Sequence, residues 1–321
     1  MKFRTEIKIP QKNTINTTSH ILMIGSCFVE SMYAKLCSYK IPITYNPFGI
    51  TYNPISIAHQ LCSLHNNQKP KVDIISNVPY PFSHHGMYRK ETLKETDDAI
   101  NQTWLPAQRE FCNINTYIFT LGSAYAWKRN NVIVNNCHKR PAKEFTRELL
   151  SIDTITSSLS AAFSLLPKDC IIICTVSPIR HIRDGLQENN ISKSTLRMSL
   201  HELERQDSRI QYFPSFEIMT DDLRDYRFYE EDLIHPSKMA VDYIWNQFKQ
   251  YAIGDPLEER QIEIQSLHKR LSHRPSHPKS AEYKRFIETT KRLLDTLQKR
   301  HPNLDWSTER KQMRKLTALY P

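Results

Sequence analysis

The sequence predicts an α/β protein with three layers, α/β/α, in which helices cover both faces of a mostly parallel sheet of about five strands. Two features of the sequence predict this fold class. Strand-like apolar runs recur between residues 21 and 213, and segments with helical spacing separate them. In sheets of this kind, ligands bind beyond the carboxyl ends of the strands, so polar residues that directly follow a strand are candidates for a site.

The strands are expected at five apolar runs. In chain order these are Ile21–Ile24, Ile41–Thr44, Tyr117–Leu121, Cys170–Val176 and Ile210–Phe213. The helices are expected at Val29–Tyr39, Pro54–His65, Pro141–Leu166, Ser192–Glu204 and Ser237–Tyr251. Proline opens two of these helices, which suits a first helical turn. In the last helix we expect Ser237 as the N-cap and a buried face made of Met239, Ala240, Tyr243, Ile244 and Phe248.

Two parts of the chain are expected, residues 1–255 and residues 256–321. Within the first, residues 66–112 are less regular and rich in proline, and they are interpreted as an insertion over one sheet edge. The second has no strand signal and is expected to be a helical C-terminal extension. Its central helix carries an apolar stripe that must pack on the main domain, on another subunit or on a separate partner. The stripe consists of Tyr283, Phe286, Ile287, Leu293, Leu294 and Leu297.

Charge is concentrated in the extension, which contributes 15 Lys and Arg against 8 Asp and Glu to a total net charge of +10. A solvated helical face explains such a basic segment better than a nucleic-acid surface does, so nucleic acid is not expected as a partner. No apolar run approaches the roughly 20 residues that cross a membrane, and the N-terminal stretch has no secretory pattern. The sequence gives no indication of an oligomeric state.

The seven cysteines are scattered without a C-x-x-C pair, which argues against a disulfide framework and a structural zinc site. A cytoplasmic, reducing location is therefore expected. With six glycines and no glycine-rich phosphate loop, the sequence predicts neither a nucleotide cofactor nor a bound metal.

The first expected strand runs directly into Gly25-Ser26-Cys27-Phe28. A serine at this place can project its hydroxyl over the sheet, where backbone N–H groups at the helix start can stabilise an oxyanion. The alternative role for Ser26 is that of a helix N-cap. Cys27 is an alternative nucleophile, because thiols acidify near helix N-termini. As the neighbouring helical position, however, it is expected to pack beneath the helix.

The segment EEDLIHPS, residues 230–237, lies just before the last expected helix of the main domain. On a loop, the spacing of Asp232 and His235 can place the carboxylate on the imidazole Nδ1–H, which leaves Nε2 free to take a proton from a hydroxyl. A single parallel sheet would bring this loop and Ser26 to the same rim. The sequence therefore predicts a Ser26-His235-Asp232 triad.

The IGSCF motif at residues 24–28 resembles the motif of the GSCFA family, a branch of the SGNH/GDSL hydrolase superfamily. The resemblance continues over residues 1 to about 250 in YNPFGITYNP (45–54), FTLGSAY (119–125), NNCHKRPAKEF (135–145), TVSPIRHIRDG (175–185) and YFPSFEIMTDDLRDYRFYEEDLIHPS (212–237). It implies a flavodoxin-like fold with the nucleophile in a Gly-Asp-Ser block, and Ser26 is placed at that nucleophile. The Asp-x-x-His block matches Asp232 and His235.

The resemblance also implies an oxyanion hole, with Gly49 as the best match to the family's second block. The third block reads Gly-x-Asn-Asp in the superfamily, but Ala124 stands where the asparagine is expected. Ser123 and Asn136 are candidate substitute donors, and His138 is a third. An oxyanion hole that lacks one donor typically loses about 10²–10³ in rate.

Four further residues are candidates for contacts with substrate: Asn46, His138, Arg180 and His181. Asn46 is also expected to form a turn beside a proline. Arg180 and His181 follow the fourth expected strand, and they either bind an anionic or hydroxylated substrate or pair with Asp184.

Together these residues lead us to expect a serine esterase that acts on a short acyl ester, such as an acetyl ester of a carbohydrate. An O-acyltransferase would use the same chemistry. The alternative from another class is a binding protein for an anionic glycan, lipid or nucleic acid, motivated by the absent asparagine and the basic extension.

Overall fold

The computed structural model describes residues 4–274 and 280–318. A five-stranded sheet of parallel strands, in the spatial order β10-β9-β5-β1-β2, forms its centre. The strands are β1 (Ile21–Gly25), β2 (Ile43–Tyr45), β5 (Thr116–Leu121), β9 (Ile171–Val176) and β10 (Ile210–Tyr212). The predicted fold class is thereby confirmed, and each strand lies at one of the expected apolar runs.

The sheet has a flavodoxin-like strand order. Counted along the chain, its five strands lie in the spatial order 2-1-3-4-5, so the direction of winding changes between β1 and β5. Ligands of such sheets bind at the carboxyl ends of the two strands that flank this change. In this protein those ends are Gly25 of β1 and Leu121 of β5.

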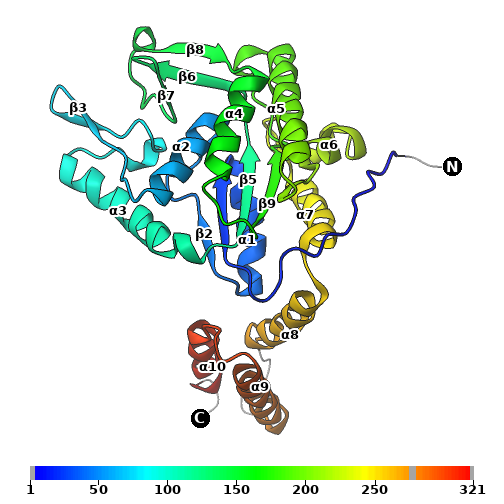
Figure 1. Cartoon of the computed structure of the whole chain (residues 1–321). Helices are drawn as coiled ribbons and strands as arrows, with labels where there is room; N and C mark the ends of the chain where they lie inside the picture. Colours follow the sequence, from blue (N-terminus) through cyan, green and yellow to red (C-terminus); the bar gives the residue numbers. More distant parts are fainter. Residues whose placement is uncertain (1–3, 275–279, 319–321) are drawn as a thin grey trace.

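Helices cover both faces of the sheet, as Figure 1 shows. Alternate residues of β1 enter different clusters: Leu22 and Ile24 face one side, and Ile21 and Met23 face the other. The first side is covered by α2 (Pro54–His65), α3 (Leu93–Glu110), α4 (Ile152–Phe163) and α5 (Leu186–Gln206). The second is covered by α1 (Cys27–Leu36) and α7 (Lys238–Ala252). Burial on both faces explains why these strands read as continuous apolar runs.

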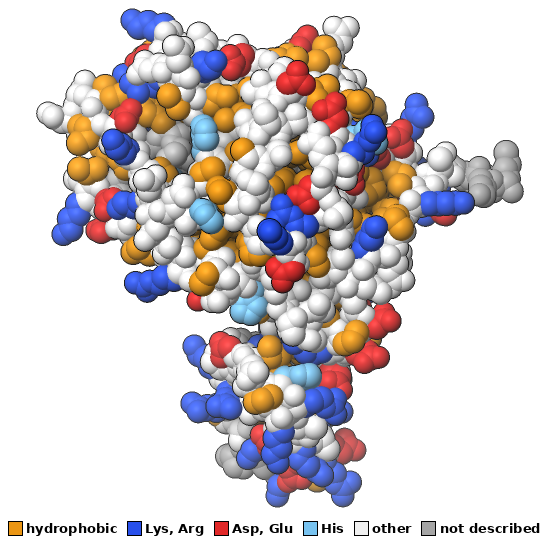
Figure 2. Space-filling view, in the orientation of Figure 1, with side chains coloured by type: hydrophobic (Ala, Val, Ile, Leu, Met, Phe, Trp, Pro, Cys, Tyr) orange, Lys and Arg blue, Asp and Glu red, His pale blue; other side chains and the backbone are white. Residues whose placement is uncertain are grey.

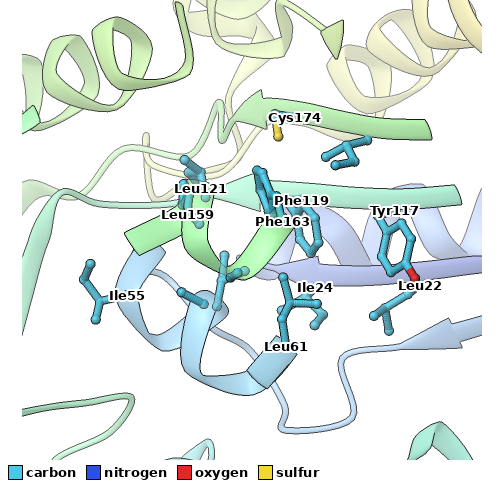
Figure 3. Packing of buried hydrophobic residues seen from close by; sticks show 14 of the residues in the cluster. Leu22, Ile24, Ile55, Leu61, Tyr117, Phe119, Leu121, Leu159, Phe163 and Cys174 are labelled. Carbon is cyan, nitrogen blue, oxygen red and sulfur yellow. The ribbon is translucent and has the colours of Figure 1, made fainter. Parts of the chain in front are cut away.

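Figure 3 shows the packing on the first side, where the ring of Phe119 from β5 lies against that of Phe163 from α4. The two rings are stacked with centroids 5.2 Å apart, and both side chains are buried. Burying a phenylalanine in this way stabilises the fold by roughly 1.5–3 kcal/mol relative to leaving it exposed.

Local sequence signals set several helix ends correctly. The α2 helix has the predicted bounds, with Pro54 in its first turn and the Asn53 side chain accepting from the N–H of Ser56. Ser237 is the N-cap of α7, as predicted. On the expected buried face of α7, however, Met239 is exposed. The face is rotated, and Trp245, Tyr251 and Ala252 are buried on it.

The single helix predicted for Pro141–Leu166 is wrong. Residues Thr146–Leu149 form β8, and Ser151 then caps α4, which begins at Ile152. The β8 strand pairs with β6 (Tyr125–Arg129), which also pairs with β7 (Val132–Val134) in a small antiparallel sheet. This sheet follows β5 directly and lies beyond the carboxyl ends of the central strands, at the top of Figure 1. Because its partner is a separate segment, the strand has no local signal.

Residues 66–112 are more regular than expected. They contain a hairpin of β3 (Asp73–Ile75) and β4 (Val78–Tyr80), followed by α3. Thr92 and Glu95 form a capping box at the start of α3. Ile100 and Trp104 of this helix are buried in the same cluster as β1 and β5, so the segment is part of the main core.

The C-terminal region is helical, as predicted, with α8 (Asp255–Leu271), α9 (Ala281–Arg300) and α10 (Ser307–Ala318). The apolar stripe of α9 packs on α8 and α10 in a separate cluster that includes Ile264 and Met313. A buried carboxylate joins this cluster to the main body: Glu309 binds Lys40 Nζ at 3.0 Å and His268 Nε2 at 2.6 Å. The stripe is therefore covered within the chain itself.

Short turns complete the elements. They are η1 (Cys37–Tyr39), η2 (Gly86–Tyr88), η3 (Phe111–Asn113), η4 (Ala142–Glu144), η5 (Ile182–Asp184), α6 (Ser215–Glu217), the π-turn η6 (Ile218–Asp222) and η7 (Tyr226–Phe228). In the part of the chain that the structure describes, no helix is both long enough and apolar enough to cross a membrane.

Candidate functional site

The site lies where β1 passes into α1. Gly25 ends β1 so close to β5 that a Cβ at this position would lie 2.4 Å from the carbonyl oxygen of Thr120. Any side chain would push the two strands apart, which explains the glycine. The N–H of Ser26 then donates to the same Thr120 carbonyl at 3.1 Å. The first residues of α1 are thus fixed at the change in strand order.

Ser26 is fully buried, and its side chain points towards β9. Its Oγ donates to the Oγ of Ser177, the residue that follows β9, at 2.9 Å. The backbone of Ser26 is at the N-cap position of α1, but its hydroxyl caps none of the helix N–H groups. Within residues 4–274 and 280–318, Ser26 makes no hydrogen bond to His235, so the structure does not bring the expected nucleophile and base together.

Cys27 is the residue that meets the imidazole. Its Sγ lies 3.8 Å from His235 Nε2, a hydrogen-bonding distance for sulfur. Cys27 is partly buried and packs against the core cluster beneath α1, as expected, but its sulfur also reaches His235, because the neighbouring Ser26 takes the inward position to reach Ser177. Consecutive residues at a helix start point in different directions, so the thiol faces the loop that carries His235.

Asp232 and His235 have the geometry that their spacing predicts. The carboxylate Oδ2 lies 2.6 Å from Nδ1 of His235. Its Oδ1 accepts from the backbone N–H groups of Ile234, at 2.9 Å, and His235, at 3.0 Å. These backbone and side-chain hydrogen bonds lower the pKa of Asp232 to about 2. An ionised carboxylate on Nδ1 keeps Nε2 directed at the thiol and stabilises the imidazolium form.

The groups around Cys27 shift the pKa of its thiol in opposite directions. Burial raises the pKa of the thiol above its ordinary value, and this effect dominates. The backbone N–H at the helix start, the Tyr52 hydroxyl and the Lys193 ammonium each lower that pKa in part. Burial likewise raises the pKa of Tyr52, to about 12. The resting thiol is therefore protonated at neutral pH, and it needs a base to become a nucleophile.

Lys193 is a site residue that the sequence analysis missed. It lies on α5 and is 1% exposed, with Nζ donating to the carbonyl of Gly122 at 2.7 Å and that of Ser177 at 2.9 Å. Burial lowers its pKa to about 7. The spacing contained a signal: Lys193 comes three residues before Leu196 and seven before Leu200, on the buried stripe of the helix.

The backbone N–H groups of Gly49 and Ser123 are engaged elsewhere, and the Asn136 side chain is held by its oxygen. The N–H of Gly49 donates to the carbonyl of Asn46 at 2.7 Å. Ser123 donates its own N–H to Tyr52, and its Oγ accepts from Tyr125. The Asn136 side chain accepts from the N–H of His138 at 2.7 Å. The first N–H groups of α1, which have no partner within a helix and are not capped by Ser26, are better placed for this role.

Asn46 and Arg180 hold backbone and loops in place. The buried Asn46 side chain accepts from the N–H of Gly25 at 2.9 Å, which joins the loop after β2 to the end of β1. The guanidinium of Arg180 lies 4.1 Å from the ring centroid of Tyr229, in the segment that leads to His235. Asp184 pairs with Arg147, and neither Arg180 nor His181 forms a salt bridge among the described residues.

His138 and His181 line a cavity of about 310 Å³, and Tyr52, which interacts with the thiol, lines it too. The His181 ring packs edge-on against Tyr52, with centroids 5.3 Å apart. Burial lowers the pKa of both histidines, that of His181 to about 3, so both rings are neutral at physiological pH. Neither ring forms a hydrogen bond to His235 in the described ranges. In the same ranges, no three His, Cys, Asp or Glu side chains are grouped as metal ligands would be.

Fold and site together define a flavodoxin-like α/β protein with a thiol, an imidazole and a carboxylate in line at the change in strand order. Comparison with family models assigns the chain to a named group. The GSCFA family model matches residues 20–248, and a second model, the C-terminal domain of GSCFA domain proteins, matches residues 264–318. The chain belongs to the GSCFA family. A search of curated proteins found no match.

Proposed function

We propose that this protein is an enzyme that cleaves an ester by acyl transfer to the Cys27 thiol, with His235 as general base and Asp232 as the residue that orients it. One observation carries the proposal: Cys27 Sγ lies 3.8 Å from His235 Nε2, while Asp232 lies 2.6 Å from Nδ1 of the same ring. Nucleophile, base and orienting carboxylate in this order are the arrangement that activates a weak nucleophile.

The proposed reaction has two steps. In the first, sulfur attacks the acyl carbon while Nε2 of His235 takes the thiol proton, which is needed because burial keeps the thiol protonated. The C–O bond to the alcohol then breaks, the imidazolium returns the proton to the leaving oxygen, and a thioester remains on Cys27. In the second step, His235 activates water in the same way, and its attack releases the acid and restores the thiol.

The start of α1 stabilises the negative charge that develops on the acyl oxygen in each step. The free N–H groups of its first turn and the positive end of the helix dipole lie next to the sulfur, because Cys27 is the first residue of the helix. Donors preorganised in this way are worth about 10²–10³ in rate for each hydrogen bond. Gly49 and Ser123 are not needed for this role.

The superfamily that the sequence resembles supports the assignment of Cys27. In its Gly-Asp-Ser block the nucleophile is the second residue after the glycine, and counting from Gly25 this residue is Cys27. Ser26 then stands at the place of the aspartate, and its buried hydrogen bond to Ser177 is a positioning contact. On this reading the nucleophile is one residue further along the chain than the sequence analysis placed it.

The proposed substrate is a short acyl ester, such as an acetyl ester of a carbohydrate. The cavity lined by Tyr52 has a volume of about 310 Å³, at the small end of ligand pockets, which suits one sugar-sized unit better than a long acyl chain. The thioester is open to attack by a sugar hydroxyl as well as by water, so acyl transfer to such a hydroxyl belongs to the same proposal.

A comparison of neighbouring variants tests the mechanism. Purified protein is incubated with p-nitrophenyl acetate, and nitrophenolate release is measured for Cys27→Ala, Ser26→Ala and Asp232→Asn. We expect Cys27→Ala to lose activity, Asp232→Asn to lose at least about 10²-fold in kcat, and Ser26→Ala to keep most of it. Equal rates for wild type and Cys27→Ala would refute the proposal, whereas loss in Ser26→Ala alone would return the nucleophile to Ser26.

Covalent labelling gives a second, direct readout. The wild-type protein is treated briefly with acetylated substrate, quenched with acid and digested, and the acetyl group is located by mass spectrometry. We expect it on the peptide that contains Cys27, in wild type and Ser26→Ala, and absent after hydroxylamine treatment, which cleaves thioesters.

The C-terminal helices favour a second candidate function, binding of an anionic polymer. Figure 2 shows basic side chains gathered over this lower part of the molecule. On α9, Lys284 and Lys291 are exposed one heptad apart, as are Arg285, Arg292 and Lys299, so they lie along one side of the helix. Retention on heparin that falls with salt and with Lys284→Glu/Lys291→Glu would support this function, and no retention would refute it.

A further inference from the structure

The cavity that Tyr52 connects to the thiol has its own chemical character. It lies beyond the carboxyl end of β5, between the loop after β2, the small sheet of β6, β7 and β8, and the loops at residues 135–139 and 181–183. Its lining residues are Tyr52, Asn53, Ser123, Tyr125, Trp127, Val134, Asn135, Asn136, Cys137, His138, Lys139, Arg147, His181 and Arg183. We call this space the basic cavity.

The lining of the basic cavity carries positive charge and no carboxylate. Lys139, Arg147 and Arg183 line it, and no Asp or Glu is among the lining residues. Arg147 is paired with Asp184. Lys139 and Arg183 form no salt bridge within the described part of the chain, so two cations at the cavity stand without a counter-charge. Low-dielectric walls strengthen the field of such cations at the cavity.

Both guanidinium groups are held over one aromatic ring. Arg183 lies 4.9 Å and Arg147 5.3 Å from the ring centroid of Trp127, which is also a lining residue. Stacking on an indole fixes the plane of a guanidinium and leaves its N–H edges free. Such edges bind carboxylate or phosphate oxygens in pairs.

Buried polar atoms without a partner gather around the same space. They are Nδ1 of His138, Nε2 of His181, Nε of Arg147 and Oδ1 of Asn135. His138 is 5% exposed, and its other ring nitrogen is already bound to the Pro81 carbonyl at 2.9 Å. A buried polar atom left unpaired is unfavourable, so four around one cavity indicate a polar ligand rather than an apolar one.

The basic cavity is connected to the reacting sulfur through Tyr52. Tyr52 lines it, and the hydroxyl of the same residue interacts with the Cys27 thiol. His181 lines it as well and packs on Tyr52. A ligand in the cavity would therefore lie between the unpaired cations and Tyr52, the residue that joins the cavity to Cys27.

From this arrangement we infer that the basic cavity binds an anionic group, a carboxylate or a phosphate, on the alcohol part of the ester, so that the substrate is an acylated acidic sugar. The inference rests on the proposed function, because it names the substrate class of that site. Arg183 and Lys139 bind the anion, Trp127 holds the Arg183 guanidinium in place, and His138 and His181 hydrogen-bond the sugar hydroxyls.

A kinetic experiment tests the charge preference. Acetate release is measured with acetylated glucuronic acid, acetylated glucose 6-phosphate and acetylated glucose, which separate carboxylate, phosphate and neutral sugar. We expect kcat/KM to be at least tenfold higher for one or both anionic esters than for the neutral ester. The double variant Arg183→Gln/Lys139→Gln should reduce this ratio at least tenfold, while Lys94→Gln, an exposed cation on α3, should leave it unchanged.

A binding experiment separates failure of this inference from failure of the proposed function. Calorimetric titration of Cys27→Ala with glucuronate, glucose 6-phosphate and glucose needs no turnover. Saturable binding of an anionic sugar that disappears in the double variant supports the inference even if no ester is cleaved. Equal kcat/KM for the three esters, together with no anion binding, overturns it while ester cleavage by Cys27 stands.

Discussion

The buried ammonium of Lys193 makes the stability of this protein depend on pH in a predictable direction. Lys193 is 1% exposed and has no carboxylate partner among the residues that the structure describes, and its pKa falls from 10.5 to about 7. In the unfolded chain the same group returns to its ordinary pKa. Between these two values the unfolded chain binds more protons than the native protein, so the free energy of unfolding rises with pH.

The size of this effect follows from the two pKa values. From pH 7 to pH 8.5 the Lys193 contribution to the free energy of unfolding increases by roughly 1–2 kcal/mol, since the slope approaches about 1.4 kcal/mol per pH unit above the native pKa. Below pH 6 the contribution is constant, because the group is protonated in both states. Other ionising groups add their own pH dependence, which a paired comparison removes.

The test compares wild type with Lys193→Met, which has a similar length and no charge. Urea unfolding is followed by circular dichroism at pH 6, 7 and 8.5, and the difference in unfolding free energy between the two proteins is plotted against pH. The substitution also removes the buried charge and leaves the carbonyls of Gly122 and Ser177 without the ammonium, so the two proteins differ in stability for reasons besides ionisation. Only the change of this stability difference with pH reports the ionisation of Lys193.

We expect the difference between wild type and Lys193→Met to grow by roughly 1–2 kcal/mol from pH 7 to 8.5, in favour of wild type. Lys94→Met, a control at an exposed lysine on α3, should show no such slope. A difference that is the same at all three pH values would refute the reasoning, because Lys193 would then keep an ordinary pKa despite its burial.

Two further predictions concern stability. Glu309 is buried against Lys40, and its pKa is lowered to about 2. Its contribution to stability is therefore complete above pH 4.5 and is lost as pH falls towards 2. Glu309→Gln should destabilise the protein by about 1–3 kcal/mol at pH 7, and in thermal unfolding the variant should lose less stability than wild type from pH 5 to 3. Phe119→Ala removes the ring stacked on Phe163 and should lower the free energy of unfolding by about 3–5 kcal/mol in urea titrations, a loss under 1 kcal/mol being incompatible with the packing described.

Two predictions from the sequence were wrong because contacts with distant segments decided the outcome. Residues 146–149 have a helical pattern, yet they pair with β6, and nothing local specifies that partner. The same holds for Met239, which the period of α7 assigned to the buried face and the structure exposes. In both cases helical spacing described the segment correctly in isolation, and packing against another element decided which residues are covered.

Which residue is the proposed nucleophile also depended on tertiary structure, for a similar reason. Ser26 and Cys27 are adjacent, and both suit a helix start after a strand. Which of them faces His235 is decided by Ser177, 151 positions away, because the hydrogen bond between the two hydroxyls turns Ser26 inward. A shift of one residue at a helix start changes the direction of every side chain, and sequence patterns locate helix starts only to within a few residues.

By itself, the sequence determined the fold class, the five strands, the bounds of α2 and the contact of Asp232 with Nδ1 of His235. These features depend on apolar runs, proline and capping residues, and a three-residue spacing, all of which act over a short stretch of chain. Only the tertiary structure decided that Cys27 meets His235, that Lys193 is buried without a counter-ion, and that three cations line one cavity. Each of these arises where segments far apart in sequence meet at the ends of β1, β5 and β9, and there the energy of burial and pairing outweighs any local preference.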